Sequence, residues 1–141
     1  MRRRAAIVAI GAGLLATGCA GSGTDGSGTS EAAPAGATLL APNAFAEVVA
    51  DEQAFVINVH VPDEGSIEGT DAAIPFDRIE AAQADLPSDL ATPLAVYCRS
   101  GTMSEEAVAA LTDLGYTDIV DLDGGMQAWT AEGLPLLPAG S

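Results

Sequence analysis

Three short apolar runs, separated by stretches with helical spacing, constrain the fold of this chain more than any other feature. The runs cover residues 54–59 (AFVINV), 94–97 (LAVY) and 119–122 (IVDL). Nearly continuous apolar runs of this length are typical of strands buried on both faces, as in a parallel sheet covered by its crossover helices. Strands that alternate with helices predict an α/β fold with helices on both faces of the sheet.

The remaining elements are weaker and complete the prediction. Short strands are expected at 38–40 and 72–74, which gives a parallel sheet of about five strands. Helices are expected at 42–50, 77–84, 104–114 and 126–132. For the second helix we expect Asp77 as the N-cap, with Ile79 and Ala82 facing inward. Gly115 predicts the end of the third helix.

The chemistry is concentrated at Cys98, which follows the apolar run 94–97 directly. This position lies at the carboxyl edge of the sheet, where open α/β folds bind ligands. Gly101 allows a tight turn, and the helix that follows directs N–H groups and its positive dipole end at the sulfur. Such surroundings lower a thiol pKa, although Glu105 and Glu106 oppose the effect. The alternative interpretation is a small buried residue that merely closes a strand.

The segment 98–104 (CRSGTMS) resembles the active-site loop of rhodanese-type sulfurtransferases. Residues 122–129 (LDGGMQAW), followed by GLP at 133–135, are similar to the closing segment of that family. Upstream, residues 56–60 and 68–75 occupy the places of its second strand and following loop. INVHVP with EGTDAAIPFD is also similar to a subgroup of secreted or lipid-anchored bacterial rhodanese domains. The resemblance covers nearly all of residues 38–138.

The resemblance implies a single rhodanese-like domain in which Cys98 accepts a sulfane sulfur from a donor such as thiosulfate, polysulfide or a persulfide. The resulting persulfide passes its outer sulfur to a thiol or other thiophilic acceptor in a ping-pong scheme. Backbone N–H groups of the loop would cradle the persulfide. The resemblance requires no metal and no organic cofactor. The loop residues are Arg99, Ser100, Gly101, Thr102, Met103 and Ser104.

The sequence departs from the family pattern at two places near the site. Asn58-Val59-His60 stands where many rhodaneses have Asp-Val-Arg, and Met103 stands where Arg or Lys is common. Both changes remove positive charge, which puts a preference for an anionic donor in question. His60 could supply a titratable cation or a hydrogen bond, or only bond a backbone carbonyl. Asp71 could face the same pocket or be simply solvated.

The start of the chain predicts export and lipid anchoring. Arg2 to Arg4 precede an apolar stretch that is too short to span a membrane. It ends in Leu-Ala-Thr-Gly-Cys, which resembles a lipobox with Cys19 as the lipidated residue. We therefore expect a signal peptide at 1–18, a lipidated Cys19 with a Gly/Ser-rich tether over 19–37, and the domain at 38–138, on the extracytoplasmic side of the membrane. The alternative is an ordinary secretory signal with an incidental Cys.

Charge and residue positions exclude several functions. The formal net charge is −15, and it becomes −18 without residues 1–18, since all 20 acids lie from Asp25 onward. Such a chain is not expected to bind nucleic acid. A phosphatase of the related fold would need an Arg where Ser104 stands, and a thioredoxin-like protein would need a Cys in place of Gly101. The remaining alternative is a non-enzymatic rhodanese-fold module that binds a protein partner or senses oxidants through its thiol.

Overall fold

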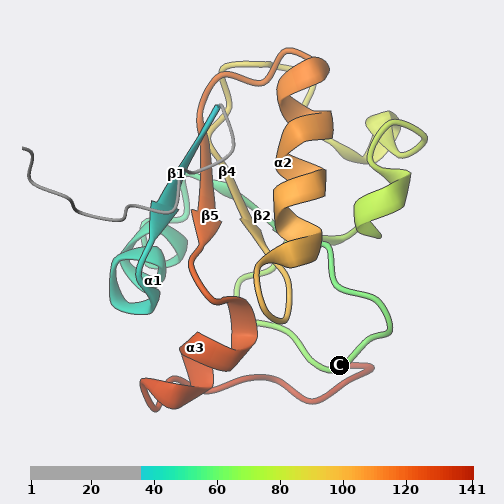
Figure 1. Cartoon of the computed structure of the whole chain (residues 1–141). Coiled ribbons are helices and arrows are strands. Elements are labelled where there is room, and N and C mark those ends of the chain that lie inside the picture. Colours follow the sequence, from blue (N-terminus) through green and yellow to red (C-terminus); the bar gives the residue numbers. More distant parts are fainter. Residues whose placement is uncertain (1–35) are drawn as a thin grey trace, which may run out of the picture.

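The three apolar runs form the centre of a parallel five-stranded β-sheet in the computed structural model, which describes residues 36–141 (Figure 1). The spatial order is β1-β5-β4-β2-β3, and all neighbouring pairs are parallel. The strands are β1 (Ala37–Leu40), β2 (Phe55–Asn58), β3 (Ala72–Ala73), β4 (Leu94–Tyr97) and β5 (Ile119–Leu122). The predicted α/β class and strand number are confirmed.

The central strand β4 explains the continuous apolar run from which it was predicted. All four of its residues are buried, because β5 and β2 flank it and helices cover both of its faces. Its carboxyl end meets those of β2 and β5 at one edge of the sheet. Figure 1 shows the turn between β4 and α2 and the start of α3 at this same edge.

Helices cover both faces of the sheet, as predicted. They are α1 (Pro42–Ala50), α2 (Thr102–Asp113) and α3 (Gly125–Ala131). On one face Phe45 of α1 and Trp129 of α3 pack with Tyr97 and Leu122. On the other face, α2 and residues 76–85 enclose a second core with inward-facing residues of β2, β4 and β5.

The predicted helix over 77–84 is wrong. Two short 3₁₀ helices, Phe76–Arg78 and Gln83–Asp85, stand there instead. Pro75 rather than Asp77 precedes the first, and no side chain caps it. The Ala82 N–H bonds the carbonyls of both Arg78 and Ile79, so the backbone alternates between α and 3₁₀ spacing. The inward faces of Ile79 and Ala82 are confirmed.

Helix α2 begins two residues earlier than predicted, at Thr102, directly after Gly101. Gly101 has φ of 105°, a left-handed conformation that favours glycine and permits this tight start. Met103 and Ser104 therefore lie in the first helical turn rather than in a loop. Gly115, with φ of 103°, follows the end of the helix as predicted.

The predicted signal peptide, Cys19 and nearly all of the predicted tether lie outside the described residues. Within residues 36–141, no helix is both long and apolar enough to cross a membrane.

Candidate active site

Cys98 lies immediately after β4 and is 1% exposed. Its Sγ accepts a hydrogen bond from the Gly101 N–H at 2.9 Å. The thiol also lies 3.6 Å from Ser104 Oγ, to which it donates, and the Ser104 hydroxyl donates in turn to the Gly101 carbonyl at 2.9 Å. The segment 98–104 thus closes around the sulfur, and the N-terminus of α2 begins beside it.

The start of α3 braces this loop from outside. The Met126 N–H donates to the Cys98 carbonyl at 2.9 Å, and the Gln127 N–H donates to the Arg99 carbonyl at 3.0 Å. Gly125 makes this approach possible, because a Cβ there would lie 2.5 Å from the Cys98 carbonyl oxygen. The two carbonyls therefore point toward α3, while the Gly101 N–H points at the sulfur.

The side chains of the loop mostly face outward. Arg99, Ser100 and Thr102 are exposed, whereas Ser104 is fully buried. Met103 is partly buried and packs against the core beneath α2. Contact with the sulfur in this loop is therefore made by the backbone of Gly101 and by the Ser104 hydroxyl.

Asn58 and His60 lie where β2 ends, next to the end of β4. Asn58 is buried and organises the following loop: its Oδ1 accepts from the His60 N–H, and its Nδ2 donates to the Gly65 carbonyl, both at 3.0 Å. The His60 ring is paired through Nε2 with Glu64 at 2.5 Å rather than with a backbone carbonyl. Its Nδ1 is buried without a partner among the described residues.

Glu64 connects the two cationic candidates, His60 and Arg99, although no sequence motif points to it. Arg99 Nη1 donates to both carboxylate oxygens of Glu64 at 2.9 and 3.0 Å. The hydrogen bond from His60, followed by the charge of Arg99, lowers the pKa of the Glu64 carboxyl, although partial desolvation opposes them. Glu64 belongs to an acidic loop that gave no signal of its own, and only the β2–β4 pairing brings it to Arg99.

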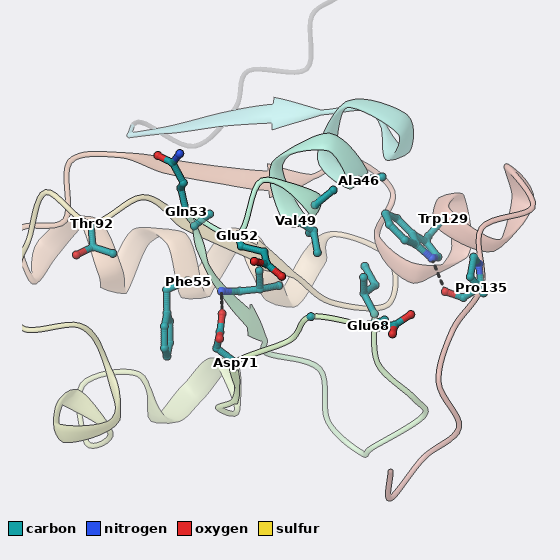
Figure 2. Close-up of a pocket in the computed structure, with 15 residues that line it drawn as sticks. Ala46, Val49, Glu52, Gln53, Phe55, Glu68, Asp71, Thr92, Trp129 and Pro135 are labelled. Carbon is teal, nitrogen blue, oxygen red and sulfur yellow. Dashed lines mark hydrogen bonds between the residues drawn. The ribbon is translucent and has the colours of Figure 1, made fainter.

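Asp71 is not in contact with the Cys98 loop. Its carboxylate accepts a hydrogen bond from the Val56 N–H at 2.8 Å. Figure 2 shows it at the edge of a groove of about 720 Å³ between α1, β2 and α3, with Phe55 and Trp129 among the lining residues. None of residues 98–104 lines this groove. Trp129 packs in the core: its Nε1 donates to the Pro135 carbonyl, and its ring packs edge-on against Phe45.

A second residue to which no sequence motif points is Asp121 in β5, which is 2% exposed. Burial raises the pKa of its carboxyl to about 6, although the neighbouring Ser104 hydroxyl and Leu122 N–H favour the charged form and oppose the shift. Its Oδ1 has no partner among the described residues. The available signal was an acid inside an otherwise apolar strand run.

The arrangement suits a sulfur nucleophile. A backbone N–H donates to Cys98 Sγ, and the N-terminus of α2 begins directly beside it. Within residues 36–141, no three His, Cys, Asp or Glu side chains gather in a way that could hold a metal ion.

Comparison with known proteins agrees with this geometry. The model of the rhodanese-like domain family matches residues 46–132. A thiosulfate sulfurtransferase GlpE from Pseudomonas fluorescens is 28% identical over 67% of this chain and 93% of its own length. A sulfurtransferase from Allochromatium vinosum is 36% identical over 45% of this chain, and the match spans only 58% of that relative.

A solved structure gives the same result. The crystal structure of a rhodanese-related protein from Thermoplasma volcanium is 30% identical and superposes with a TM-score of 0.60, covering 71% of this chain and 97% of that protein. The family match spans more than half of the chain and includes the Cys98 loop, β5 and α3. The chain therefore belongs to the rhodanese-like domain family.

Proposed function

We propose that this protein is a sulfurtransferase that carries a sulfane sulfur on Cys98. In the first step the Cys98 thiolate attacks the outer sulfur of a donor such as thiosulfate, a polysulfide or a persulfide. A new S–S bond forms, and the former bond of that sulfur breaks with its electron pair on the leaving group, which is sulfite in the case of thiosulfate. In the second step a thiophilic acceptor attacks the outer sulfur and releases the Cys98 thiolate.

The observation that carries this proposal is the hydrogen bond from the Gly101 N–H to Cys98 Sγ in a loop braced by α3. A cysteine that only closed a strand would need no such cradle. The sulfurtransferase names of the relatives agree with this chemistry. Both steps exchange sulfur between nucleophiles, so the cycle needs no metal, no organic cofactor and no external oxidant.

The choice of donor depends on charge at the entrance. Arg99 is the cation nearest the sulfur in sequence, and its guanidinium is paired with Glu64. An anionic donor would have to compete with that carboxylate. The protonated or singly charged persulfide of a small thiol carries less negative charge than the thiosulfate dianion and is therefore as suitable a donor as thiosulfate.

The test is the intact mass of the full chain carrying Cys19→Ser, which leaves Cys98 as the only thiol. After brief exposure to thiosulfate or polysulfide, we expect the mass of one added sulfur atom, lost again on treatment with cyanide or a thiol. The matched control also carries Cys98→Ser and should gain nothing. If Cys98 stays unmodified by every donor, the proposal is wrong, and a binding or redox-sensing role takes its place.

We also propose that the protein is exported and anchored to the membrane by a lipid on Cys19, with the domain on the extracytoplasmic side. The support is the Arg-rich start, the short apolar stretch and the lipobox-like ending of the sequence. In a bacterial host the mature protein should begin at Cys19, carry the mass of a diacylglycerol and partition into detergent. A Cys19→Ser variant that partitions equally well would contradict this.

A further inference from the structure

Behind the active-site loop lies a carboxyl group that the sulfur-transfer steps do not use. Asp121 is the third residue of β5, with Val96 of β4 and Leu39 of β1 as its neighbours in register. It lies two residues after Ile119, which belongs to the core beneath α2, so both side chains point to the α2 face. It is 2% exposed, and its Oδ1 has no partner among the described residues.

The Ser104 hydroxyl stands between this carboxyl and the sulfur. Ser104 is fully buried in the first turn of α2. Its oxygen accepts from the Cys98 thiol at 3.6 Å, and the same hydroxyl lies beside the Asp121 carboxyl, whose charged form it favours. A hydroxyl has a single proton to donate, and here the Gly101 carbonyl, at 2.9 Å, receives it. The sulfur, the carboxylate and this carbonyl therefore compete for one proton.

The protonation state of Asp121 decides this competition. A neutral carboxyl can donate to Ser104, which leaves the hydroxyl proton free for an anionic sulfur. An ionised carboxyl attracts that proton away and adds a negative charge near the sulfur.

The groups that face Asp121 do not compensate its charge. Glu105 on α2 and Asp123 beyond the end of β5 both disfavour the ionised carboxyl. β1 carries no titratable side chain, and Tyr97 of β4 packs in the opposite core. The Cys98 thiol lies on the other side of the Ser104 hydroxyl, to which it donates. Burial raises the pKa of Asp121 to about 6, so its charge changes in the range in which thiol reactivity is measured.

We propose that Asp121 is a positioning residue for Cys98. The proton on the Asp121 carboxyl, acting through the Ser104 hydroxyl, controls how readily the Cys98 sulfur becomes a nucleophile. The inference deepens the proposed sulfur-transfer role, because it assigns a regulator of the same sulfur. The ionised Asp121 carboxyl makes the Cys98 sulfur less reactive as a nucleophile, and the neutral carboxyl makes it more reactive.

The experiment measures alkylation of Cys98 by iodoacetamide, a neutral probe, followed by intact mass in the full chain carrying Cys19→Ser. Asp121→Asn mimics the neutral carboxyl permanently. The ratio of its rate to that of the parent should be close to one at pH 5, where the parent carboxyl is mostly protonated. At pH 7.5 the ratio should rise to about tenfold, as expected for removal of a nearby like charge.

Two further variants separate this route from its alternatives. Asp123→Asn removes the same charge from an exposed position two residues along, and should change either rate by less than about twofold. In a Ser104→Ala background, Asp121→Asn should lose most of its effect at pH 7.5. Should Asp121→Asn not fold, Asp121→Ser removes the same charge and gives the same two ratios.

A ratio that is equal at pH 5 and pH 7.5 would mean a merely structural residue and would overturn the inference. A full tenfold effect that persists in the Ser104→Ala background would overturn the route through the hydroxyl. Alkylation requires no sulfur donor, so these outcomes remain readable even if Cys98 accepts no sulfur. The failure of the inference and the failure of the proposed function are thus distinguishable.

Discussion

At the scale of single residues, Gly125 shows how a position distant in sequence shapes the surroundings of Cys98. Its φ of 59° lies in the left-handed region, and a Cβ would meet the carbonyl carbon and oxygen of Arg99 as well as the Cys98 oxygen, all at 2.5 to 2.6 Å. These are backbone atoms, which cannot move without moving the loop itself. The glycine is therefore required by the contact between α3 and the loop as well as by its own conformation.

Gly125→Ala should displace the Cys98 loop. We expect a loss of about 2–4 kcal/mol in the free energy of unfolding and at least tenfold slower sulfur loading of Cys98. Denaturant unfolding and intact mass after exposure to a sulfur donor measure the two effects. Gly133→Ala is the matched control, because Gly133 is also left-handed, with φ of 78°, but has no atom within 4 Å of the added Cβ. The control should cost about 1–2 kcal/mol and leave loading unchanged; equal loading in both variants would contradict the bracing role.

At the scale of elements, β5 is unusual for an interior strand because it contains a buried acidic residue. Three of its four residues are apolar, and the fourth, Asp121, is buried with them. Because burial raises the pKa of this carboxyl from 3.8 to about 6, the folded state holds its proton in a pH range where the unfolded state has lost it. Stability therefore falls as pH rises from about 4 to about 6, by at most about 3 kcal/mol for this group.

Asp121→Asn should remove that loss. Relative to the wild type, the variant should gain about 1–3 kcal/mol in the free energy of unfolding at pH 8 and gain little at pH 4. Urea unfolding at the two pH values measures the difference. Asp123→Asn, which changes an exposed acid, should show no such pH-dependent difference. A variant destabilised equally at both pH values would mean that the carboxylate is satisfied in the folded state.

The elements differ in how far the sequence predicts them. α1, β4 and β5 have the predicted bounds, because strong apolar patterns and a proline at the helix start are local signals. Residues 76–85 do not form the helix that was predicted over 77–84. Their apolar residues have helical spacing, but their backbone hydrogen bonds change between α and 3₁₀ spacing. The position of Cys98 between β4 and α2 could be predicted because the strand, the loop and the helix follow one another directly in the sequence. Glu64 lies 35 residues from Arg99, and the sequence alone gives no signal for such a pairing.

At the scale of the whole molecule, negative charge dominates. Residues 36–141 contain 18 Asp or Glu residues and two arginines, a formal charge of −16. Arg99 is paired with Glu64 beside the Cys98 loop. The field of the molecule therefore repels an anion approaching the site, and salt screens that repulsion.

We expect the rate of sulfur loading of Cys98 by thiosulfate, a dianion, to rise severalfold between low salt and about 0.3 M salt. Alkylation by neutral iodoacetamide should change little over the same range, which controls for any effect of salt on the fold. Both rates are measured by intact mass on the same preparation. A thiosulfate rate that falls with added salt would show a locally positive entrance and contradict the expected repulsion.

The way in which α3 holds the carbonyls of Cys98 and Arg99 separates two tasks within one short segment. The main chain, fixed from outside, forms the cradle for the sulfur, while the side chains of Arg99, Ser100 and Thr102 project away from it into solvent. These three residues can therefore be substituted without changing the backbone arrangement around the sulfur. Under the proposed function, selectivity for different sulfur compounds can diverge there, by evolution or by engineering, while the backbone around Cys98 stays unchanged.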